Sequence, residues 1–260
     1  MARQYALLAV TAENEHGALT ITLSNPARKN ALGARMVNEL LYALDDAMAD
    51  DAVRSIVVTG AGSAFCAGGD LSQLASDGDP LPFKGDFAAL LARILDANKP
   101  IIARVNGHAM GGGLGLVAAS HFAIAASDAK LGTPEIDVGL FPMMLMAVLR
   151  RHVPERRLTA MMLLGQRLDA EEALGLGLVG RVVPASELDL AVGELTRALG
   201  EKSPVAVKLG LEAMAQSREL GLEAALPFLR DKLGECLATE DAREGLAAFV
   251  EKRKPVWRGR

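Results

Sequence analysis

Residues 101–119, IIARVNGHAMGGGLGLVAA, contain the pattern that decides the fold, an apolar strand joined through glycines to an apolar helix. Asn106-Gly107 ends the predicted strand 101–105, and the glycines 111–113 precede a predicted helix from Leu114 to about Ala119. Successive glycines let the backbone approach a ligand closely, and N–H groups at a helix N-terminus are unpaired and attract negative charge. The segment therefore predicts an oxyanion site, although a lone glycine triplet could equally mark tight packing of a strand on a helix.

The same alternation of strands and helices extends toward the N-terminus. Apolar residues at helical spacing predict a helix over 34–49, and a buried strand at 54–59 is followed by a helix at about 86–97. Two further strands, 5–11 and 18–23, are predicted before them. Strands that alternate with helices favour an α/β fold.

Beyond about residue 185 the pattern becomes purely helical. The predicted helices cover 186–199, 204–217, 221–233 and 239–250. Ser203 before Pro204 is a favourable start for the second of them. We therefore divide the chain into an α/β core, residues 1–200, and a C-terminal helical region, residues 201–260.

A second glycine-rich segment, residues 60–71 (GAGSAFCAGGDL), follows the predicted strand 54–59. A dinucleotide-binding fingerprint would need its third glycine where Phe65 stands, so the segment does not predict a nucleotide site of that kind. Taken alone, the segment is as compatible with a turn that only reverses the chain as with a ligand site.

A third segment, residues 131–142 (LGTPEIDVGLFP), places Glu135 and Asp137 among apolar residues. A glutamate after a proline is usually a solvated surface residue, but the apolar flanks favour partial burial here. Burial raises the pKa of a carboxyl group and suits it to proton transfer. Glu135 is therefore a candidate acid/base.

Composition excludes several classes of protein. The formal net charge of −4 argues against general nucleic-acid binding. Cys66, Cys236 and the four histidines lack metal-ligand spacing, so no metal site is predicted. The apolar stretches are interrupted before they reach membrane-spanning length, and the first residues show no signal-peptide pattern. We expect a soluble cytoplasmic protein without a membrane partner.

Two other segments have simple structural interpretations. Residues 72–85 are rich in Gly, Pro and Asp and predict a mobile loop. The apolar run Met143–Leu149 predicts a core helix in which methionines fill irregular space.

Together the segments resemble the enoyl-CoA hydratase/isomerase (crotonase) superfamily along nearly the whole chain. The matching motifs are NPARKNAL at 25–32, AFCAGGDL at 64–71, NGHAMGGG at 106–113, and Pro134-Glu135 followed by GLFP at 139–142. The resemblance implies a spiral of ββα units with a C-terminal helical trimerisation region, and hence a homotrimer or a dimer of trimers. It also implies an acyl-CoA substrate and no cofactor, because coenzyme A is part of the substrate.

The resemblance further implies the residues of the site. The N–H groups of Gly69 and Gly112 would hold the oxygen of a thioester enolate, and Glu135 would move a proton. The residues implied to contact the CoA thioester are Arg28, Ala67, Gly68, Asp70, Leu71, Gly111, Gly115 and Lys252. Among these, Arg28, and Lys252 of a neighbouring subunit, are the implied phosphate partners.

The chain departs from the hydratase pattern at Gly115, where the best-known hydratases carry a second glutamate. Some hydratases resembling those for branched or dicarboxylic enoyl-CoA esters share this glycine, and the family also includes isomerases with a single glutamate. We therefore expect an enoyl-CoA hydratase, for branched or polar acyl chains, and keep two alternatives. One is a 3-enoyl to 2-enoyl-CoA isomerase that uses Glu135 alone, and the other is a CoA-ester-binding protein with little turnover.

The glycine leaves open what would hold the attacking water. Candidates are Asp137, an acidic residue of the predicted loop such as Asp77 or Asp79, or a polar group of the substrate itself. A competing interpretation is that Gly115 makes room for a bulky acyl chain. We expect residues 72–85 and the helix after Pro142 to shape the acyl pocket.

Overall fold

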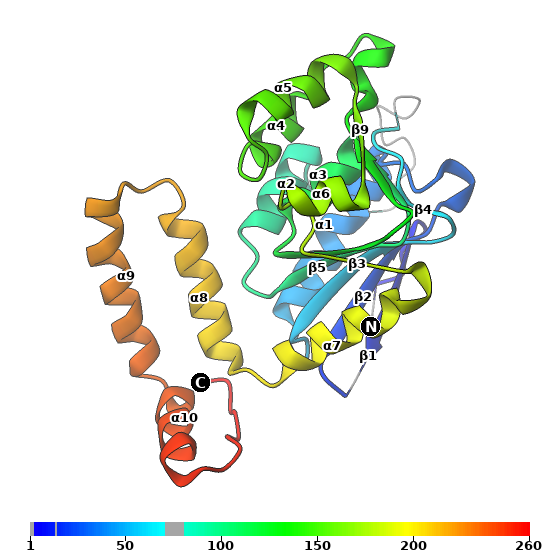
Figure 1. The fold of residues 1–260 in the computed structure, drawn as a ribbon. Coiled ribbons are helices and arrows are strands. Elements are labelled where there is room, and N and C mark those ends of the chain that lie inside the picture. Colours follow the sequence, from blue (N-terminus) through cyan, green and yellow to red (C-terminus); the bar gives the residue numbers. More distant parts are fainter. Residues whose placement is uncertain (1–2, 14, 71–80) are drawn as a thin grey trace.

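The computed structural model describes residues 3–13, 15–70 and 81–260. Leu71, Asp77 and Asp79, and the larger part of the loop predicted at 72–85, lie outside these residues. Figure 1 shows a body of sheets and helices from which the C-terminal helices project.

In the described part of the chain, the larger sheet has six strands in the order β1-β2-β3-β5-β7-β10. They are β1 (Leu8–Glu13), β2 (Ala18–Leu23), β3 (Ser55–Gly60), β5 (Ile101–Val105), β7 (Phe122–Ala126) and β10 (Arg181–Val183). β1 and β2 are antiparallel, and every later pair is parallel. β3 is buried at every position, as expected for a parallel strand covered on both faces.

A smaller sheet consists of β4 (Ala64–Cys66), β6 (His108–Met110), β8 (Lys130–Gly132) and β9 (Arg167–Asp169), in that order. The first three run parallel, and β9 is antiparallel to β8. All four strands are three residues long, too short to produce a periodic signal in the sequence.

The helices of the body are α1 (Ala34–Ala49), α2 (Phe87–Leu95), α3 (Gly112–Ala119), α4 (Met143–Leu149), α5 (Glu155–Leu164), α6 (Ala170–Gly175) and α7 (Leu188–Gly200). Short 3-10 turns are η1 (Pro26–Arg28), η2 (Pro134–Val138) and η3 (Ala185–Glu187). The chain passes from β3 to β4 to α2, then from β5 to β6 to α3, and then from β7 to β8 and on to η2 and α4. Each pass adds one strand to each sheet, so the predicted α/β spiral of ββα units is confirmed.

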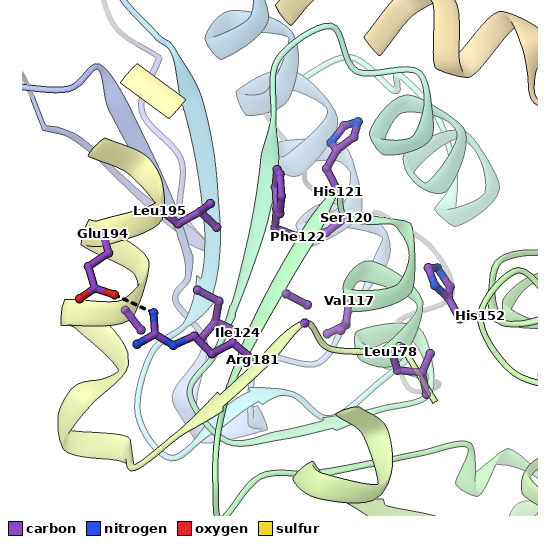
Figure 2. Close-up of a pocket in the computed structure, with 14 residues that line it drawn as sticks. Val117, Ser120, His121, Phe122, Ile124, His152, Leu178, Arg181, Glu194 and Leu195 are labelled. Atoms are coloured by element: carbon purple, nitrogen blue, oxygen red, sulfur yellow. Dashed lines mark hydrogen bonds and ion pairs between the residues drawn. The ribbon is translucent and has the colours of Figure 1, made fainter. Parts of the chain in front are cut away.

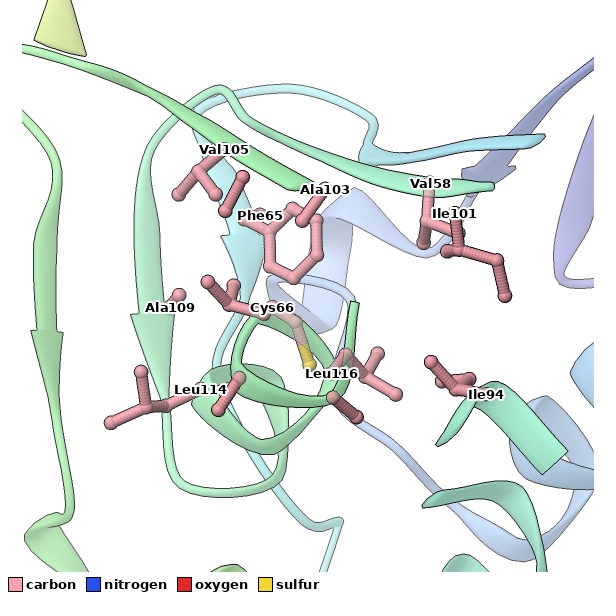
Figure 3. Close-up of a cluster of buried hydrophobic side chains, with 14 of the residues drawn as sticks. Val58, Phe65, Cys66, Ile94, Ile101, Ala103, Val105, Ala109, Leu114 and Leu116 are labelled. Atoms are coloured by element: carbon pink, nitrogen blue, oxygen red, sulfur yellow. The ribbon is translucent and has the colours of Figure 1, made fainter. Parts of the chain in front are cut away.

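The core has two parts, on the two faces of the larger sheet. Val57 and Ile102 face α7, whereas Val58 and Ala103 belong to the main cluster with α1, α2 and α3. Figure 3 shows the centre of the main cluster, where Phe65 and Cys66 of β4 lie among side chains of the sheet and of α3. Phe65 is fully buried, so the side chain that breaks the dinucleotide fingerprint fills the core instead.

The C-terminal helices are α8 (Pro204–Ser217), α9 (Leu222–Leu237) and α10 (Glu240–Glu251). The Ser203 hydroxyl accepts a hydrogen bond from Ala206 N–H, which confirms the predicted start of α8. α8 and α9 lie side by side and stand away from the sheets in Figure 1. The division of the chain at residue 200 stays a prediction. Among the described residues, no helix is both long enough and apolar enough to cross a bilayer.

Candidate active site

Three neighbouring strands of the smaller sheet bring the candidate residues to one edge. β4, β6 and β8 are parallel, so their carboxyl ends lie along the same side of the sheet. Gly69, Gly112 and Glu135 follow these strands within three residues. All three line a cavity of about 900 Å³. The topology therefore places two backbone N–H groups and one carboxyl group around a single space.

Gly69 lines the cavity and is held with its N–H turned away from Leu32. Leu32 N–H donates to Gly68 O at 2.7 Å, and Asp70 N–H donates to Leu32 O at 3.0 Å. In this parallel bridge the two neighbours of Gly69 make the bonds, so the N–H of Gly69 itself points away from Leu32. Among the hydrogen bonds of the described residues, none uses that N–H. Among the described residues, no atom would lie within 4 Å of a Cβ on Gly69.

Asn30 braces the segment that carries Gly69. Its side chain is buried, donating through Nδ2 to Ala61 O and Ala64 O at 2.9 Å each and accepting from Asn25 N–H at 3.0 Å. Asn30 adopts a positive φ of 57°, a conformation that asparagine tolerates better than most residues. In the sequence, Asn30 is visible only as part of the motif at 25–32. Its hydrogen bonds to Ala61 and Ala64 could not be predicted, because these residues are more than 30 positions away.

Gly112 is the first residue of α3, so its N–H has no partner within the helix. The preceding Gly111 has a φ of 49°, and a Cβ there would lie 2.6 Å from Glu135 Oε1. A Cβ on Gly113 would lie 2.5 Å from Cys66 O. The two outer glycines therefore allow close packing, Gly111 on the Glu135 carboxyl and Gly113 on β4. The middle glycine, Gly112, lines the cavity.

The Glu135 carboxyl group is half-buried, and its Oε2 has no hydrogen-bond partner among the described residues. Burial raises the pKa of Glu135 above its usual value, and a hydrogen bond to its own backbone opposes part of that rise. An unpaired buried carboxyl oxygen costs stability, so it marks a place where a ligand can supply the partner.

The other wall of the cavity is apolar. It includes Phe87 at the start of α2, Phe141, and Met143 and Met144 of α4. The prediction that α4 is a core helix was wrong for Met143, Met144 and Met146, which are 65%, 47% and 38% exposed. Met143 and Met144 line the cavity, and an apolar cavity lining has the same sequence signature as a core.

Gly115 differs from its expected place. It is buried within α3 and is not part of the cavity lining. A Cβ on Gly115 would lie 3.1 Å from Phe87 Cζ, 3.5 Å from Leu145 Cγ and 3.6 Å from Leu91 Cδ2. The ring of Phe87 therefore occupies the space beside Gly115, and nothing in the sequence indicated that these two residues meet.

The remaining candidates are distributed as follows. Ala67, Gly68, Asp70 and Gly111 line the cavity, as does Asp137, whereas Leu71 lies outside the described residues. Arg28 is exposed and does not line the cavity, but it forms an ion pair with Asp70, which does. Lys252 follows α10, at the opposite end of the molecule from α4 in Figure 1. Its predicted contact with a neighbouring subunit stays a prediction.

A second cavity, of about 450 Å³, lies at the C-terminal end of α3 (Figure 2). Its polar groups are paired: Arg181 with Glu194 in an ion pair, and His152 Nε2 with Ala118 O at 2.9 Å. His121 Nδ1 accepts a hydrogen bond from Ile101 N–H, and burial lowers its pKa to about 4. This cavity lacks the unpaired carboxyl group of the first, so we interpret it as structural.

Comparison with known proteins gives consistent relatives. Residues 13–260 match the family described as enoyl-CoA hydratase/isomerase. A Bacillus subtilis protein named "Probable enoyl-CoA hydratase" is 38% identical over 247 residues, covering 92% of this chain and 94% of the relative. The 2,3-dehydroadipyl-CoA hydratase of Escherichia coli is 35% identical over 244 residues, covering 93% of this chain and 95% of that protein.

Solved structures agree with these sequences. The crystal structure of enoyl-CoA hydratase from Mycobacterium smegmatis superimposes with a TM-score of 0.89 at 31% identity. The superposition covers 96% of this chain and 98% of that one.

Proposed function

The chain is an enzyme that belongs to the enoyl-CoA hydratase/isomerase family, and we propose that it hydrates 2-enoyl-CoA thioesters with Glu135 as the acid/base. The observation that carries this proposal is the unpaired Glu135 Oε2 in a cavity that also receives the free N–H groups of Gly69 and Gly112. Such an arrangement fits a reaction in which a thioester oxygen gains negative charge while a proton moves nearby.

The two N–H groups would form the oxyanion hole. The thioester oxygen gains negative charge when a nucleophile adds at C3, so donors fixed in advance bind the transition state more tightly than the substrate. Removing one such donor typically costs about 3 kcal/mol of transition-state stabilisation. Gly112 adds the positive end of the α3 dipole to this effect.

Glu135 would manage the protons of hydration. As the water oxygen bonds to C3, the carboxylate takes a water proton and the C2–C3 π electrons move into the enolate. The protonated Glu135 then returns that proton to C2, so one water is added and the carboxylate is restored. The raised pKa of Glu135 suits a group that must both accept and donate a proton.

Isomerisation of 3-enoyl to 2-enoyl thioesters is the second candidate, and Gly115 is the observation that favours it. With no side chain at residue 115, Glu135 is the carboxyl group that lines the cavity together with the two proposed N–H donors, Gly69 and Gly112. It could remove a proton from C2 and return it to C4 without any bound water. Turnover assays with 2-enoyl and 3-enoyl thioesters separate the two reactions, and binding of both esters without turnover would instead identify a CoA-ester-binding protein.

We place the CoA portion along Ala67–Asp70 and the start of α1, which line the cavity. The ion pair with Asp70 holds Arg28 beside this segment, where its charge could serve a phosphate. Leu71 and, from a neighbouring subunit, Lys252 complete the proposed contacts. Replacing Arg28 with alanine should weaken the binding of CoA itself and of acyl-CoA by the same factor.

We also propose that the chain forms a homotrimer or a dimer of trimers. α9 and α10 expose large apolar side chains, including Leu222 at 75% and Phe249 at 83%. Apolar surface of this extent is typical of a face that another protein covers. Light scattering at micromolar concentration should give the mass of three or six chains, and a monomer would remove this part of the proposal.

A further inference from the structure

The side chain of Phe87 stands against the first turn of α3. Phe87 begins α2, and Asp86 caps that helix by accepting a hydrogen bond from Ala89 N–H at 3.0 Å. A Cβ on Gly112 would lie 3.4 Å from Phe87 Cζ, and a Cβ on Gly115 would lie 3.1 Å from the same atom. The ring therefore lies beside the residue whose N–H is the proposed second oxyanion donor.

This position fixes what the ring would contact. A thioester oxygen held by Gly112 N–H puts the first carbons of the acyl chain within a few bond lengths of Phe87. Phe87 lines the cavity, as do Phe141, Met143 and Met144 beyond it. The acyl chain would therefore leave the reacting carbons along a wall of carbon and sulfur atoms.

The charged groups of the described cavity lining are four carboxyl groups, of Asp70, Asp86, Glu135 and Asp137, and one guanidinium group, of Arg167. Asp86 caps α2, and Asp70 is paired with Arg28. Arg167, the single cationic residue in the described lining, belongs to β9 and packs beside Gly132 in the preceding strand β8. A carboxylate on the acyl chain would therefore meet either the apolar wall, where it loses its hydration, or a lining in which carboxyl groups outnumber the single cation.

We propose, on the basis of the function proposed above, that Phe87 is a specificity-determining residue that selects enoyl-CoA esters with an aliphatic hydrocarbon chain. Gly115 contributes to this specificity because the absence of a side chain there leaves room for the Phe87 ring. Selection then arises from burial of the acyl carbons against Phe87, with Phe141, Met143 and Met144 continuing the same surface. The flexible methionine side chains adapt this surface to chains of different shape.

The test measures binding of saturated esters, which cannot be hydrated or isomerised. Titration calorimetry compares hexanoyl-CoA with adipoyl-CoA, which has the same number of acyl carbons and a terminal carboxylate, with CoA as reference. We expect hexanoyl-CoA to bind at least about 10-fold more tightly than adipoyl-CoA. Tighter binding of adipoyl-CoA, lost in Arg167→Ala, would overturn the proposal in favour of a polar acyl site.

Two variants assign the selectivity to the ring. Phe87→Ala should reduce affinity for hexanoyl-CoA by about 10-fold while leaving affinity for CoA within about two-fold. Phe122→Ala makes the same change in the wall of the second cavity and should alter neither value. Phe87→Leu preserves more of the packing on α3, so it should fall between wild type and Phe87→Ala if the latter is poorly folded. Unchanged hexanoyl-CoA affinity in a folded Phe87→Ala protein would contradict the proposal.

These measurements stand apart from catalysis. If the protein shows the expected ester preference but no turnover, the proposed reaction fails and the role of Phe87 stands. If it turns over enoyl esters but shows no preference that depends on Phe87, the reaction stands and the specificity inference fails.

Discussion

The two ends of α3 meet two cavities with opposite hydrogen-bonding character. At the C-terminal end, Ser120 N–H and hydroxyl both bond to Leu116 O, and His152 bonds to Ala118 O. At the N-terminal end, Gly112 N–H and Glu135 Oε2 have no partner among the described residues. Unmade hydrogen bonds cost free energy of folding, so the contrast favours the N-terminal end of α3 as the place where a ligand supplies the missing partners.

The cavities also differ in how their titratable groups are tuned. Burial shifts both Glu135 and His121 toward their neutral forms. His121 then uses its neutral ring as an acceptor for Ile101 N–H, whereas Glu135 keeps an oxygen free. The same physical cause therefore acts on a hydrogen-bonded residue at one end and on the proposed acid/base at the other.

The sharpest test of the contrast replaces one carboxyl group with an amide group beside each end of α3. Glu135→Gln should lower kcat by about 10³-fold or more, because the amide cannot accept the proton, while CoA-ester affinity stays within a few-fold. The matched variant Glu194→Gln removes the charge that pairs with Arg181 beside the second cavity and should leave kcat within about two-fold. Steady-state kinetics and calorimetry provide both values, and substantial kcat in Glu135→Gln would refute the proposed acid/base.

Gly111→Ala should have the next largest effect. The added methyl would lie 2.6 Å from Glu135 Oε1 at a residue with a φ of 49°, so the carboxyl group or the start of α3 must move. We expect kcat to fall by about 10²-fold, because small displacements of a reacting group are costly. Gly193→Ala in α7 meets no atom within 4 Å and should instead raise Tm slightly. Equal activity of the two variants would contradict the proposed packing.

The pH profile tests the raised pKa of Glu135. The reactive form is the carboxylate, so kcat/KM should fall about tenfold per pH unit once the pH drops below that pKa. Because burial raises the pKa, this acid limb should begin above the usual value of 4.5 for a glutamate. Rates measured from pH 4 to 8 in one buffer series would show the limb. An acid limb centred at or below 4.5 would show that burial does not tune this group.

Residue 115 tests whether a second carboxyl group can be installed at the reactive end. Gly115→Glu alone should lower hydration of crotonyl-CoA by about tenfold, because the new side chain collides with Phe87 and is buried without a partner. Adding Phe87→Ala should open that space and raise hydration above the Gly115→Glu level. The two single variants and the double variant form a cycle, and strictly additive effects would show that residues 87 and 115 are independent.

The smallest effect is expected at the structural end. The folded pKa of His121 lies below its unfolded value, so its contribution to stability is complete above pH 6.5 and is lost as the pH falls toward 4. His121→Asn can still accept from Ile101 N–H and should therefore lose fewer degrees of Tm between pH 7 and pH 5 than wild type. An identical loss of Tm in both proteins would show that protonation of His121 does not contribute to the destabilisation by acid.

Much of the fold could be predicted because it depends on local patterns. The strand 101–105 and the helix 34–49 have clear periodicities, and the structure places β5 and α1 at those residues. The three-residue strands of the smaller sheet carry no such pattern, yet they bring the candidate residues together. Pairings between distant residues, rather than propensity, determine that sheet.

The candidate site was partly visible in the sequence. Glycines and a glutamate could be proposed from the sequence because backbone approach and proton transfer require those residue types. The bracing by Asn30 and the contact of Phe87 with Gly115 could not be predicted, because each joins segments about 30 residues apart. Met143 and Met144 were misinterpreted because cavity walls and cores share the same composition.

The packing of Phe87 on Gly115 also restricts how this enzyme could evolve. We expect a large side chain at residue 115 to collide with the aromatic ring, so a smaller residue at position 87 would have to come first. That first step would itself weaken binding of the acyl chain before any second carboxyl group could compensate. We therefore expect residues 87 and 115 to be epistatic, with a less active intermediate between an enzyme that holds the ring and one that holds two carboxyl groups.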